Sequence, residues 1–473
     1  MRKTKIICTL GPASSDDDVI RRMLLAGMNV ARVNFSHGDH ANHGKTIDRF
    51  RAVRDSLGKA AAIMLDTKGP EIRTGTFKEG KVFLEEGQTF TLTTEWIDGN
   101  QERCSITYKM LPSELGRGDT VLIDDGKIRL TVEETTDTDI RCVVNNSGVV
   151  SNHKGINVPK VRLSMDYLSP VDKADLLYGI EKDVDYVAAS FIRKKEDVEH
   201  LRHFLNVNGG KRIKIISKIE NMEGIENFEE ILELSDGIMV ARGDMGVEVD
   251  FERLPGIQKR FIKRCQQSGK ICITATQMLE SMISSPIPTR AEITDVANAV
   301  FDGTSAVMLS GETAMGKYPV EAVKTMAKIA KQAEQDDPRF VPGNGTIWHE
   351  MDSEDTTNAV GHAACTLAKD IRAEAIMAIT NSGYTATRMS KFRPITTVIA
   401  ATPYEKTFHQ MSIVWGVQPM IVENLNNVDV LIYHCLEEAK RVELIDRGDK
   451  VVISAGVPLD IPGNTNMIRV ETA

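Results

Sequence analysis

The chain of 473 residues lacks the features of a secreted or membrane-bound protein. Its seven cysteines include no C-x-x-C pair and are odd in number, at positions 8, 104, 142, 265, 272, 365 and 435. This spacing indicates neither a disulfide framework nor a zinc site. No apolar run approaches the roughly 18 residues of a membrane span, and the one near the N-terminus is too short for a signal peptide. We therefore expect a cytoplasmic protein with buried, unpaired cysteines.

Excess positive charge is also missing. The sequence has 58 Lys and Arg against 67 Asp and Glu, a net charge of -9 and a pI near 5.7. Nucleic-acid binding needs clustered Lys and Arg, so the composition disfavours it. Hydrophobic residues at 41% and charged residues at 26% are typical of a folded globular protein. The length suggests roughly two to four domains.

Short runs rich in Val, Ile and Ala recur along the chain, and each is followed by a segment with helical apolar spacing. The predicted strands are 5–9, 29–35, 61–66, 185–190, 214–219, 237–241, 271–276 and 306–310. The predicted helices are 17–26, 44–57, 171–181, 195–205, 225–234, 255–267, 290–301 and 320–335. Ser169 with Asp172, and Thr289 with Glu292, match the capping box of a helix start. Eight such units predict a closed (β/α)8 barrel, with an open doubly wound sheet as the alternative.

Two regions interrupt or follow this alternation. Residues 70–168 alternate in hydrophobicity and contain turn signals such as Asp125-Gly126, without a good helix, which predicts an inserted β-rich domain. A Pro- and Gly-containing linker at 336–345 precedes a smaller α/β domain with an open sheet. We therefore expect a barrel of residues 1–69 and 169–340, the insertion, and a C-terminal domain of residues 346–473.

The predicted second strand ends in polar side chains that share one face. Arg32, Asn34 and Ser36 alternate with Val33 and Phe35, so the cation and two oxygen-bearing groups converge. A polar face of an edge strand would give the same pattern. In a parallel barrel both faces are covered and the active site lies at the carboxyl ends of the strands, which favours a functional interpretation.

A second set of polar residues lies at the ends of the predicted strands 214–219 and 237–241. Lys218 and Glu220 share one side at the end of the strand 214–219, where a structural salt bridge is the simpler explanation, and Asp244 follows the strand 237–241. Two carboxylates suit Mg2+, which takes oxygen ligands, and an ammonium offsets charge on a transferring phosphoryl group. Gly243 and Gly246 would let backbone N–H groups approach a carboxylate or phosphate.

Two further motifs are weaker. Residues 311–317 fit G-x-x-x-x-G-K, but Tyr318 stands where a P-loop needs Ser or Thr as the Mg2+ ligand, which argues against a P-loop. His37, His40 and His43 recur at three-residue spacing, a possible metal trio. Because no recognisable zinc pattern accompanies them, a solvated loop and helix start is the preferred interpretation, with His37 alone as the functional candidate.

The sequence resembles the pyruvate kinase family over essentially its whole length. The matching segments are TKIICTLGPAS, GMNVARVNFSHG, LDTKGPEIRTG, KGINVP, ISKIEN, DGIMVARGDMGVE, ITATQMLESMI, PTRAEITDVANAV and VMLSGETAMGKYP, in family order. The resemblance implies phosphoryl transfer from phosphoenolpyruvate to ADP, giving pyruvate and ATP in glycolysis. It also implies a barrel with a lid formed by the insertion, a homotetramer, allosteric regulation, and the bacterial type without an extra C-terminal domain.

The resemblance further implies the roles of individual residues. Catalytic and substrate-binding residues would be Arg32, Lys218, Gly243, Asp244 and Thr276. Glu220 and Asp244 would bind Mg2+ or Mn2+, and K+ would be held by Asn34, Ser36, Asp66 and Thr67. Asn34, His37, Arg73 and Lys154 would face the nucleotide, while Glu71 favours the K+-dependent form. Thr276, Ser310 and Glu312 are open candidates for ordering the water or relay that protonates the enolate.

In the C-terminal domain, residues 380–385 place small hydroxyls and a glycine before a helix, which suits an anion. They resemble the family's sugar-phosphate effector pocket and comprise Thr380, Asn381, Ser382, Gly383, Tyr384 and Thr385. A well-capped helix would look the same. Two other functions stay open: a Mg2+-dependent barrel lyase or aldolase acting on pyruvate or phosphoenolpyruvate, and a non-catalytic metabolite-sensing scaffold.

Overall fold

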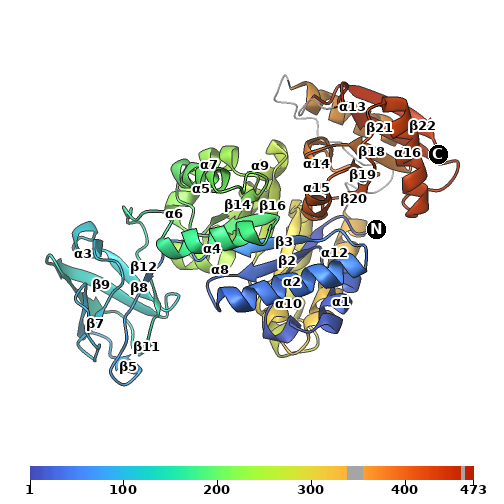
Figure 1. The fold of residues 1–473 in the computed structure, drawn as a ribbon. Helices are drawn as coiled ribbons and strands as arrows, with labels where there is room; N and C mark the ends of the chain where they lie inside the picture. Colours follow the sequence, from blue (N-terminus) through green and yellow to red (C-terminus); the bar gives the residue numbers. More distant parts are fainter. Residues whose placement is uncertain (338–354, 460–463) are drawn as a thin grey trace.

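The computed structural model describes residues 1–337, 355–459 and 464–473 (Figure 1). Three parts lie in a row: a β-rich part, a central barrel, and a C-terminal part at the opposite end, beside which the N-terminus lies. The linker predicted at 336–345 lies, from residue 338, outside the described residues, as does the predicted domain start at 346. Within the described ranges, no helix has the length and apolar character needed to cross a membrane.

The central part is a closed barrel of eight parallel strands, which confirms the predicted fold class. Its strands are β1 (Lys5–Thr9), β2 (Val30–Asn34), β3 (Ala62–Asp66), β13 (Tyr186–Ala189), β14 (Lys214–Ile219), β15 (Gly237–Ala241), β16 (Ile271–Ala275) and β17 (Ala306–Leu309). Each agrees with its predicted range to within one residue at either end. The ring closes through pairing of β1 with β17 and with β2, so the open-sheet alternative is wrong.

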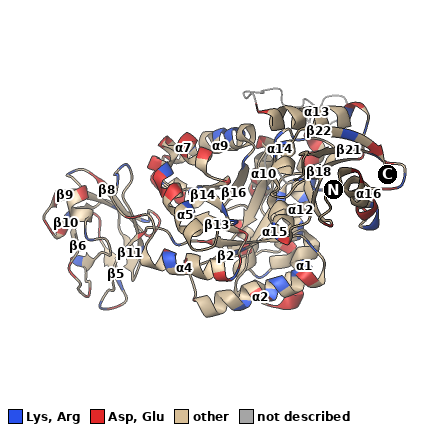
Figure 2. Ribbon diagram, turned by 45° about the horizontal axis from the view of Figure 1, so that its top comes forward, with Lys and Arg blue, Asp and Glu red and all other residues tan. Residues whose placement is uncertain are grey.

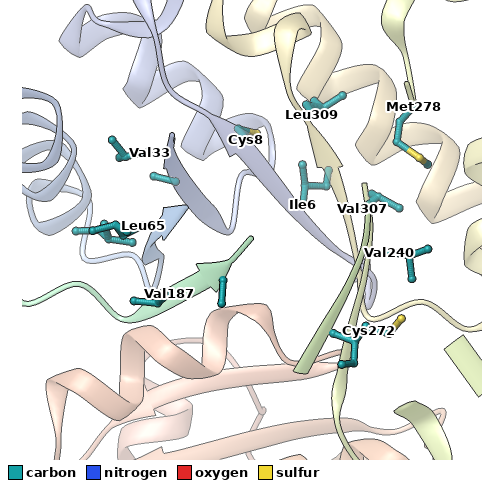
Figure 3. Close-up of a cluster of buried hydrophobic side chains, with 14 of the residues drawn as sticks. Ile6, Cys8, Val33, Leu65, Val187, Val240, Cys272, Met278, Val307 and Leu309 are labelled. Carbon is teal, nitrogen blue, oxygen red and sulfur yellow. The ribbon is translucent and has the colours of Figure 1, made fainter. Parts of the chain in front are cut away.

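Side chains on each strand alternate between the barrel interior and the surrounding helices. On β1, Ile6 and Cys8 belong to the cluster that packs outward, whereas Ile7 belongs to the cluster inside the barrel. Figure 3 shows the outward cluster, with Val33, Leu65 and Val187 on neighbouring strands. Burial on both faces explains why these strands read as nearly continuous apolar runs. All seven cysteines are buried, as expected.

The barrel helices are α1 (Asp17–Ala26), α2 (His40–Ser56), α4 (Pro170–Glu181), α5 (Lys195–Val207), α6 (Met222–Glu226), α7 (Phe228–Leu234), α8 (Arg242–Glu248), α9 (Leu254–Ser268), α10 (Arg290–Asp302), α11 (Gly311–Ala314) and α12 (Pro319–Asp336). Both predicted capping boxes are present, at the starts of α4 and α10. Two helix predictions need correction. The helix α2 begins four residues earlier than predicted, capped by the Asp39 side chain, and the helix predicted at 225–234 is divided at Asn227 into α6 and α7.

The insertion between β3 and α4 is mostly β structure. One sheet has the order β4 (Ile72–Arg73), β12 (Gly155–Asn157), β8 (Thr120–Ile123), β9 (Ile128–Thr135), β10 (Asp139–Val144), β6 (Thr89–Thr93) and β7 (Arg103–Ser105). A smaller sheet pairs β5 (Lys81–Leu84) with β11 (Gly148–Ser151). Asp125-Gly126 joins the antiparallel strands β8 and β9, as predicted. The short helix α3 (Leu111–Glu114) was not predicted.

The C-terminal part has an open five-stranded sheet, as expected. Its order is β20 (Val417–Ile421), β19 (Thr397–Thr402), β18 (Ala375–Ile379), β21 (Lys450–Ala455) and β22 (Met467–Thr472). Its helices are α13 (Thr356–Asp370), α14 (Tyr384–Lys391), α15 (Glu405–Gln410) and α16 (Val428–Arg441). The edge strand β20 was not predicted. One apolar cluster runs from the barrel interior into this part, so the two share a core.

Charged residues of both signs are interspersed over the helices (Figure 2). Acidic residues of α7 lie beside basic residues of α9, and Glu229 pairs with Arg264 at 2.9 Å. Such mixing is typical of a solvated surface and contrasts with the single-sign stripe of a nucleic-acid-binding protein.

Candidate active site

A cavity of about 690 Å³ lies between the carboxyl ends of the barrel strands and the inserted β-rich part. Nine of the predicted site residues line it: Arg32, Asn34, Ser36, His37, Arg73, Lys154, Lys218, Glu220 and Asp244. The predicted residues Asp66, Thr67, Gly243 and Thr276 do not line the cavity. Asp66 contacts the lining residues Arg32 and Lys218, and Thr67 contacts the lining residue Ser190. The alternation rule places Arg32, Asp66 and Lys218 on the interior face of the barrel, two residues after the interior residues Val30, Met64 and Ile216.

A buried network of charges forms the floor of the cavity. Arg32 Nε donates to Asp66 Oδ2 at 2.6 Å, and Lys218 Nζ donates to Asp66 Oδ1 at 3.1 Å. Lys218 Nζ also lies 3.0 Å from Glu220 Oε1. Each of these four residues is at most 8% exposed. Because two cations face two carboxylates, the network is neutral overall, which makes its burial tolerable.

The network sets the charge states of its members. Burial disfavours the ammonium of Lys218, but the charges of Asp66 and Glu220 outweigh it and raise its pKa above the usual value. Burial alone would raise the pKa of Asp66, yet Arg32 and Lys218 lower it. Burial, together with the charge of Asp244, raises the pKa of Glu220. The network therefore favours the charged form of Lys218, whereas the charged form of Glu220 is disfavoured by its burial and by Asp244, and a further cation between these two carboxylates would stabilise it.

Glu220 and Asp244 form the oxygen donor set predicted for Mg2+. Phe191 N donates to Glu220 Oε2 at 2.6 Å, which orients the carboxylate, and Asp244 lies in the first turn of α8. The raised pKa of Glu220 has the neighbouring Asp244 charge as one of its causes. Two carboxylates that repel each other at a cavity wall, beside polar space for further oxygen ligands, fit a divalent cation.

Gly243 and Thr276 are directly connected. Gly243 N donates to Thr276 Oγ1 at 2.8 Å, and that hydroxyl donates to Ala275 O at 2.6 Å. Thr276 has a positive φ of 66°, a strained conformation for a β-branched residue. The Arg242 guanidinium supports it by donating to Thr276 O at 2.6 Å. The hydrogen bonds from Gly243 and Arg242 to Thr276 hold the end of β16 against the first turn of α8.

The four residues predicted to hold K+ lie at the ends of β2 and β3. Asn34 Oδ1 accepts the N–H of Ser36 at 3.1 Å, which folds the turn after β2. Asn34 also pairs with Asp66 across β2 and β3, and Thr67 follows Asp66 directly. The set offers amide, hydroxyl, carboxylate and carbonyl oxygens, which are the donors a hard cation takes.

Arg73 and Lys154 reach the cavity from the inserted part, and both are already paired. Arg73 forms a two-pronged ion pair with Glu71, at 2.6 and 2.8 Å, and Lys68 contacts the same carboxylate at 2.7 Å. Lys154 Nζ lies 2.9 Å from Asp124 Oδ1. His37 lies at the exposed rim. Together with Asn34 at the end of β2, the four predicted nucleotide contacts thus come from both sides of the cavity.

The histidine spacing does not produce a metal trio. His40 Nε2 lies 2.5 Å from Asp175 Oδ1, and the His43 ring stacks on Phe35 with centroids 4.3 Å apart. Within the described ranges, no group of three or more His, Cys, Asp or Glu side chains is arranged for a metal ion. The predicted helix start is present in this segment, because α2 begins at His40.

Among the residues that sequence reasoning missed, two polar ones contact predicted cations of the cavity. Ser190 contacts Lys218 and lies at the end of a predicted strand, so the polar strand-end rule could have found it. Asp124, which holds Lys154, carries no such signal because the contact joins separate strands of the insertion. Glu312, an open candidate for the proton relay, accepts N–H groups from Leu279 and Ser310, so its carboxylate joins two loops.

A second cavity, of about 390 Å³, lies in the C-terminal part. Five of the six predicted effector residues line it: Thr380, Asn381, Ser382, Tyr384 and Thr385. Gly383 does not, and its positive φ of 82° forms the turn into α14. Gly383 N donates to Thr380 Oγ1 at 3.0 Å. Arg212 from the barrel and Glu423 also line this cavity.

Comparison with known proteins agrees with this architecture. Residues 1–323 match the model of the pyruvate kinase barrel domain, and residues 358–471 match that of the pyruvate kinase alpha/beta domain. The pyruvate kinase of Clostridium acetobutylicum is 49% identical over 100% of this chain and 99% of its own. That of Staphylococcus saprophyticus is 46% identical over 100% of this chain and 80% of its own.

A solved structure shows the same fold. The crystal structure of a pyruvate kinase from Cryptosporidium parvum superposes with a TM-score of 0.92, at 40% identity, over 100% of this chain and 96% of that one. Identity at this level over the full length, together with matches to both domain models, shows the family. The chain belongs to the pyruvate kinase family, and it is a phosphotransferase.

Proposed function

We propose that this enzyme transfers the phosphoryl group of phosphoenolpyruvate to ADP, giving pyruvate and ATP. The observation that carries the proposal is the buried network of Arg32, Asp66, Lys218 and Glu220 at the base of a cavity that the inserted part covers. Positioning and charge stabilisation do most of the work in phosphoryl transfer, and this network provides both. We infer that the insertion acts as a lid, and that the enzyme works in the cytoplasm.

We assign the Mg2+ or Mn2+ site to Glu220 and Asp244, and the K+ site to Asn34, Ser36, Asp66 and Thr67. The bound cations supply positive charge that offsets the phosphoryl and carboxylate oxygens of the substrates. Glu71, which holds both Lys68 and Arg73, supports the K+-dependent form. The donor sets are oxygen-only, which suits these hard cations.

The protein's own residues then divide the work. Arg32 and Lys218 face the phosphoryl group from the barrel, and Lys218, whose charged form the network favours, stabilises charge during transfer. Gly243, Asp244 and Thr276 hold the carboxylate end of the substrate at the start of α8, where backbone N–H groups favour an anion. The lid excludes water from the reacting groups.

We assign the nucleotide side to Asn34, His37, Arg73 and Lys154. Arg73 and Lys154 are paired with Glu71 and Asp124, so nucleotide phosphates would share these cations with the carboxylates or displace them.

A coupled assay tests the function. We expect pyruvate to form from phosphoenolpyruvate only when ADP and Mg2+ are both present, and faster with K+ than with Na+. Pyruvate formation without ADP would instead indicate a lyase or a phosphatase. Absence of turnover with either monovalent cation would contradict the proposal.

The divalent-cation site has a direct test. We expect Glu220→Gln to weaken Mn2+ binding, measured by electron paramagnetic resonance without substrates, by at least about tenfold, equivalent to about 1.4 kcal/mol. The matched control is Glu223→Gln, which removes another carboxylate of the same cavity and should keep wild-type affinity. Equal losses in the two variants would contradict the assignment of Glu220.

We also propose that the C-terminal cavity binds a sugar-phosphate effector and that the enzyme is an allosterically regulated homotetramer. Ser382 lines the cavity, and a carboxylate there would repel an anion. We therefore expect Ser382→Asp to abolish the thermal shift that sugar phosphates produce, whereas Ser382→Ala should keep part of it. Light scattering of the wild-type enzyme tests the tetramer. An unchanged shift in Ser382→Asp would contradict the effector site.

A further inference from the structure

Ser190 lies at the carboxyl end of β13, between the ends of β3 and β14. Its side chain is buried, and the residue is 2% exposed. Lys218 Nζ donates to Ser190 Oγ at 2.8 Å. The Ser190 hydroxyl lies 2.6 Å from Thr67 O and 3.2 Å from Asp66 Oδ1, so the closer Thr67 O is the better acceptor for its proton. A hydroxyl has one proton to donate and lone pairs to accept, so the contacts with Lys218 and Thr67 can exist together.

The backbone already joins these strand ends without the Ser190 hydroxyl. Ser190 N donates to Thr67 Oγ1 at 3.1 Å, and Thr67 N donates to Ala188 O at 3.0 Å. The hydroxyl adds a connection from the end of β3 to the Lys218 ammonium. The Ser190 hydroxyl therefore affects the position of the Lys218 ammonium more than it affects the pairing of the strands.

Lys218 has three partners: Asp66, Glu220 and Ser190. The proposed function assigns Glu220 to the divalent cation and Asp66 to the monovalent cation. Ser190 is then the partner of Lys218 that is not itself assigned to a cation, although its hydroxyl contacts Thr67 and Asp66 of the proposed K+ site. Because a hydrogen bond is directional, whereas the pull of a carboxylate on an ammonium is less so, the hydroxyl can fix the direction of the N–H groups.

We propose that Ser190 is a positioning residue for Lys218, holding its ammonium toward the transferring phosphoryl group. The inference rests on the proposed function, because it takes its importance from the role of Lys218 in phosphoryl transfer. The Ser190 hydroxyl acts through Lys218 and does not itself contact the substrate. Removing the Ser190 hydroxyl leaves the charge of Lys218 in place, but the direction in which the ammonium points is no longer fixed.

The test compares Ser190→Ala with the wild-type enzyme. We expect kcat to fall by about 10- to 100-fold, in line with the loss of one charge-assisted hydrogen bond, while the KM for phosphoenolpyruvate changes by less than about threefold. Ser190→Thr keeps a hydroxyl and should recover most of the lost kcat. Unchanged kcat in Ser190→Ala, or an effect confined to KM, would overturn the inference.

A matched control separates positioning from general stability. Ser217 precedes Lys218, is fully buried, and its hydroxyl contacts Ser235 Oγ at 2.7 Å on the opposite face of β14. Ser217→Ala also removes a buried hydroxyl, so its melting temperature should fall about as much as that of Ser190→Ala, with kcat unchanged. If both variants lose kcat in proportion to stability, the role of Ser190 is structural and the inference fails.

A double-mutant cycle asks whether Ser190 acts through Lys218. In a Lys218→Met background, Ser190→Ala should change kcat by less than about twofold, because the group that it positions is gone. An undiminished effect in that background would overturn the inference. If Ser190→Ala does not fold, Ser190→Cys, which keeps the side-chain volume and is a much weaker hydrogen-bonding group, serves in the same comparisons. Turnover by the wild-type enzyme tests the proposed function separately. A failure of the proposed function can therefore be distinguished from a failure of the inference about Ser190.

Discussion

Lys218→Met is expected to lower kcat by about 10³-fold, equivalent to about 4 kcal/mol of transition-state stabilisation. The ammonium lies in a buried network of charges, where Asp66 and Glu220 raise its pKa and so favour the charged form. Charge on the phosphoryl oxygens must be stabilised during transfer. An interaction made chiefly in the transition state lowers kcat when it is removed and changes substrate affinity much less. Steady-state kinetics with phosphoenolpyruvate as the varied substrate measures both quantities.

The matched control is Lys214→Met, which removes an ammonium from the other end of the same strand, β14. This position lies away from the carboxyl ends of the strands, so kcat should stay close to the wild-type value. If Lys218→Met raised KM and left kcat unchanged, Lys218 would contribute ground-state binding alone. That result would contradict its assigned role in stabilising the transferring group.

The barrel and much of its site were predictable because their signals are local. Eight apolar runs alternate with amphipathic segments, and the period of two in β2 places Arg32 on the interior face from sequence alone. The carboxyl-end rule then brings Lys218 and Asp244 to the same end of the barrel. The substrate identities and the K+ residues depended on family resemblance, because carboxylate and hydroxyl oxygens suit several cations.

The missed elements depend on contacts between distant segments. Pro419 argues against a strand at Val417–Ile421, but β20 is an edge strand, where a missing N–H is tolerated. The helix predicted at 225–234 is divided at Asn227, whose side chain donates to Arg193 O. The Asp39 cap of α2, in contrast, is a local signal that the prediction overlooked.

The ion pair between Lys406 and Asp185 is also invisible in the sequence, because it joins α15 of the C-terminal part to the start of β13. Lys406 Nζ donates to Asp183 O at 2.9 Å and to Val184 O at 2.7 Å, and it lies 3.4 Å from Asp185 Oδ1. The side chains of Lys406 and Asp185 are 8% and 4% exposed. Asp185 Oδ2 also accepts the N–H of Ile63 on β3, which fixes the carboxylate.

Lys406→Met is expected to reduce the free energy of unfolding by about 3 kcal/mol or more, because it leaves a buried carboxylate without its cation. The part-buried carbonyl of Val184 loses a donor as well, which adds to the cost. Urea denaturation followed by circular dichroism measures the change. Because the Lys406–Asp185 pair joins the barrel to the C-terminal part, the midpoint of the unfolding transition should shift to a lower urea concentration.

The loss should depend on pH, and its sign follows from Asp185. Burial raises the pKa of this carboxyl, and Lys406 opposes that rise. Without Lys406 the folded-state pKa rises further above the unfolded value, so the folded variant binds a proton more readily than the unfolded chain. Stability then falls as pH increases through the folded pKa. The difference between variant and wild type is therefore smaller at pH 5 than at pH 8.

Lys440→Met is the matched control, because Lys440 pairs with Glu437 on the surface of α16 at 2.7 Å. Both partners of this pair are substantially exposed, so its loss should cost no more than about 0.5 kcal/mol. Equal losses in the two variants, or a loss in Lys406→Met that does not shrink on acidification, would contradict the role of Asp185. The buried carboxylate, more than the number of ion pairs, then determines how firmly the two parts are joined.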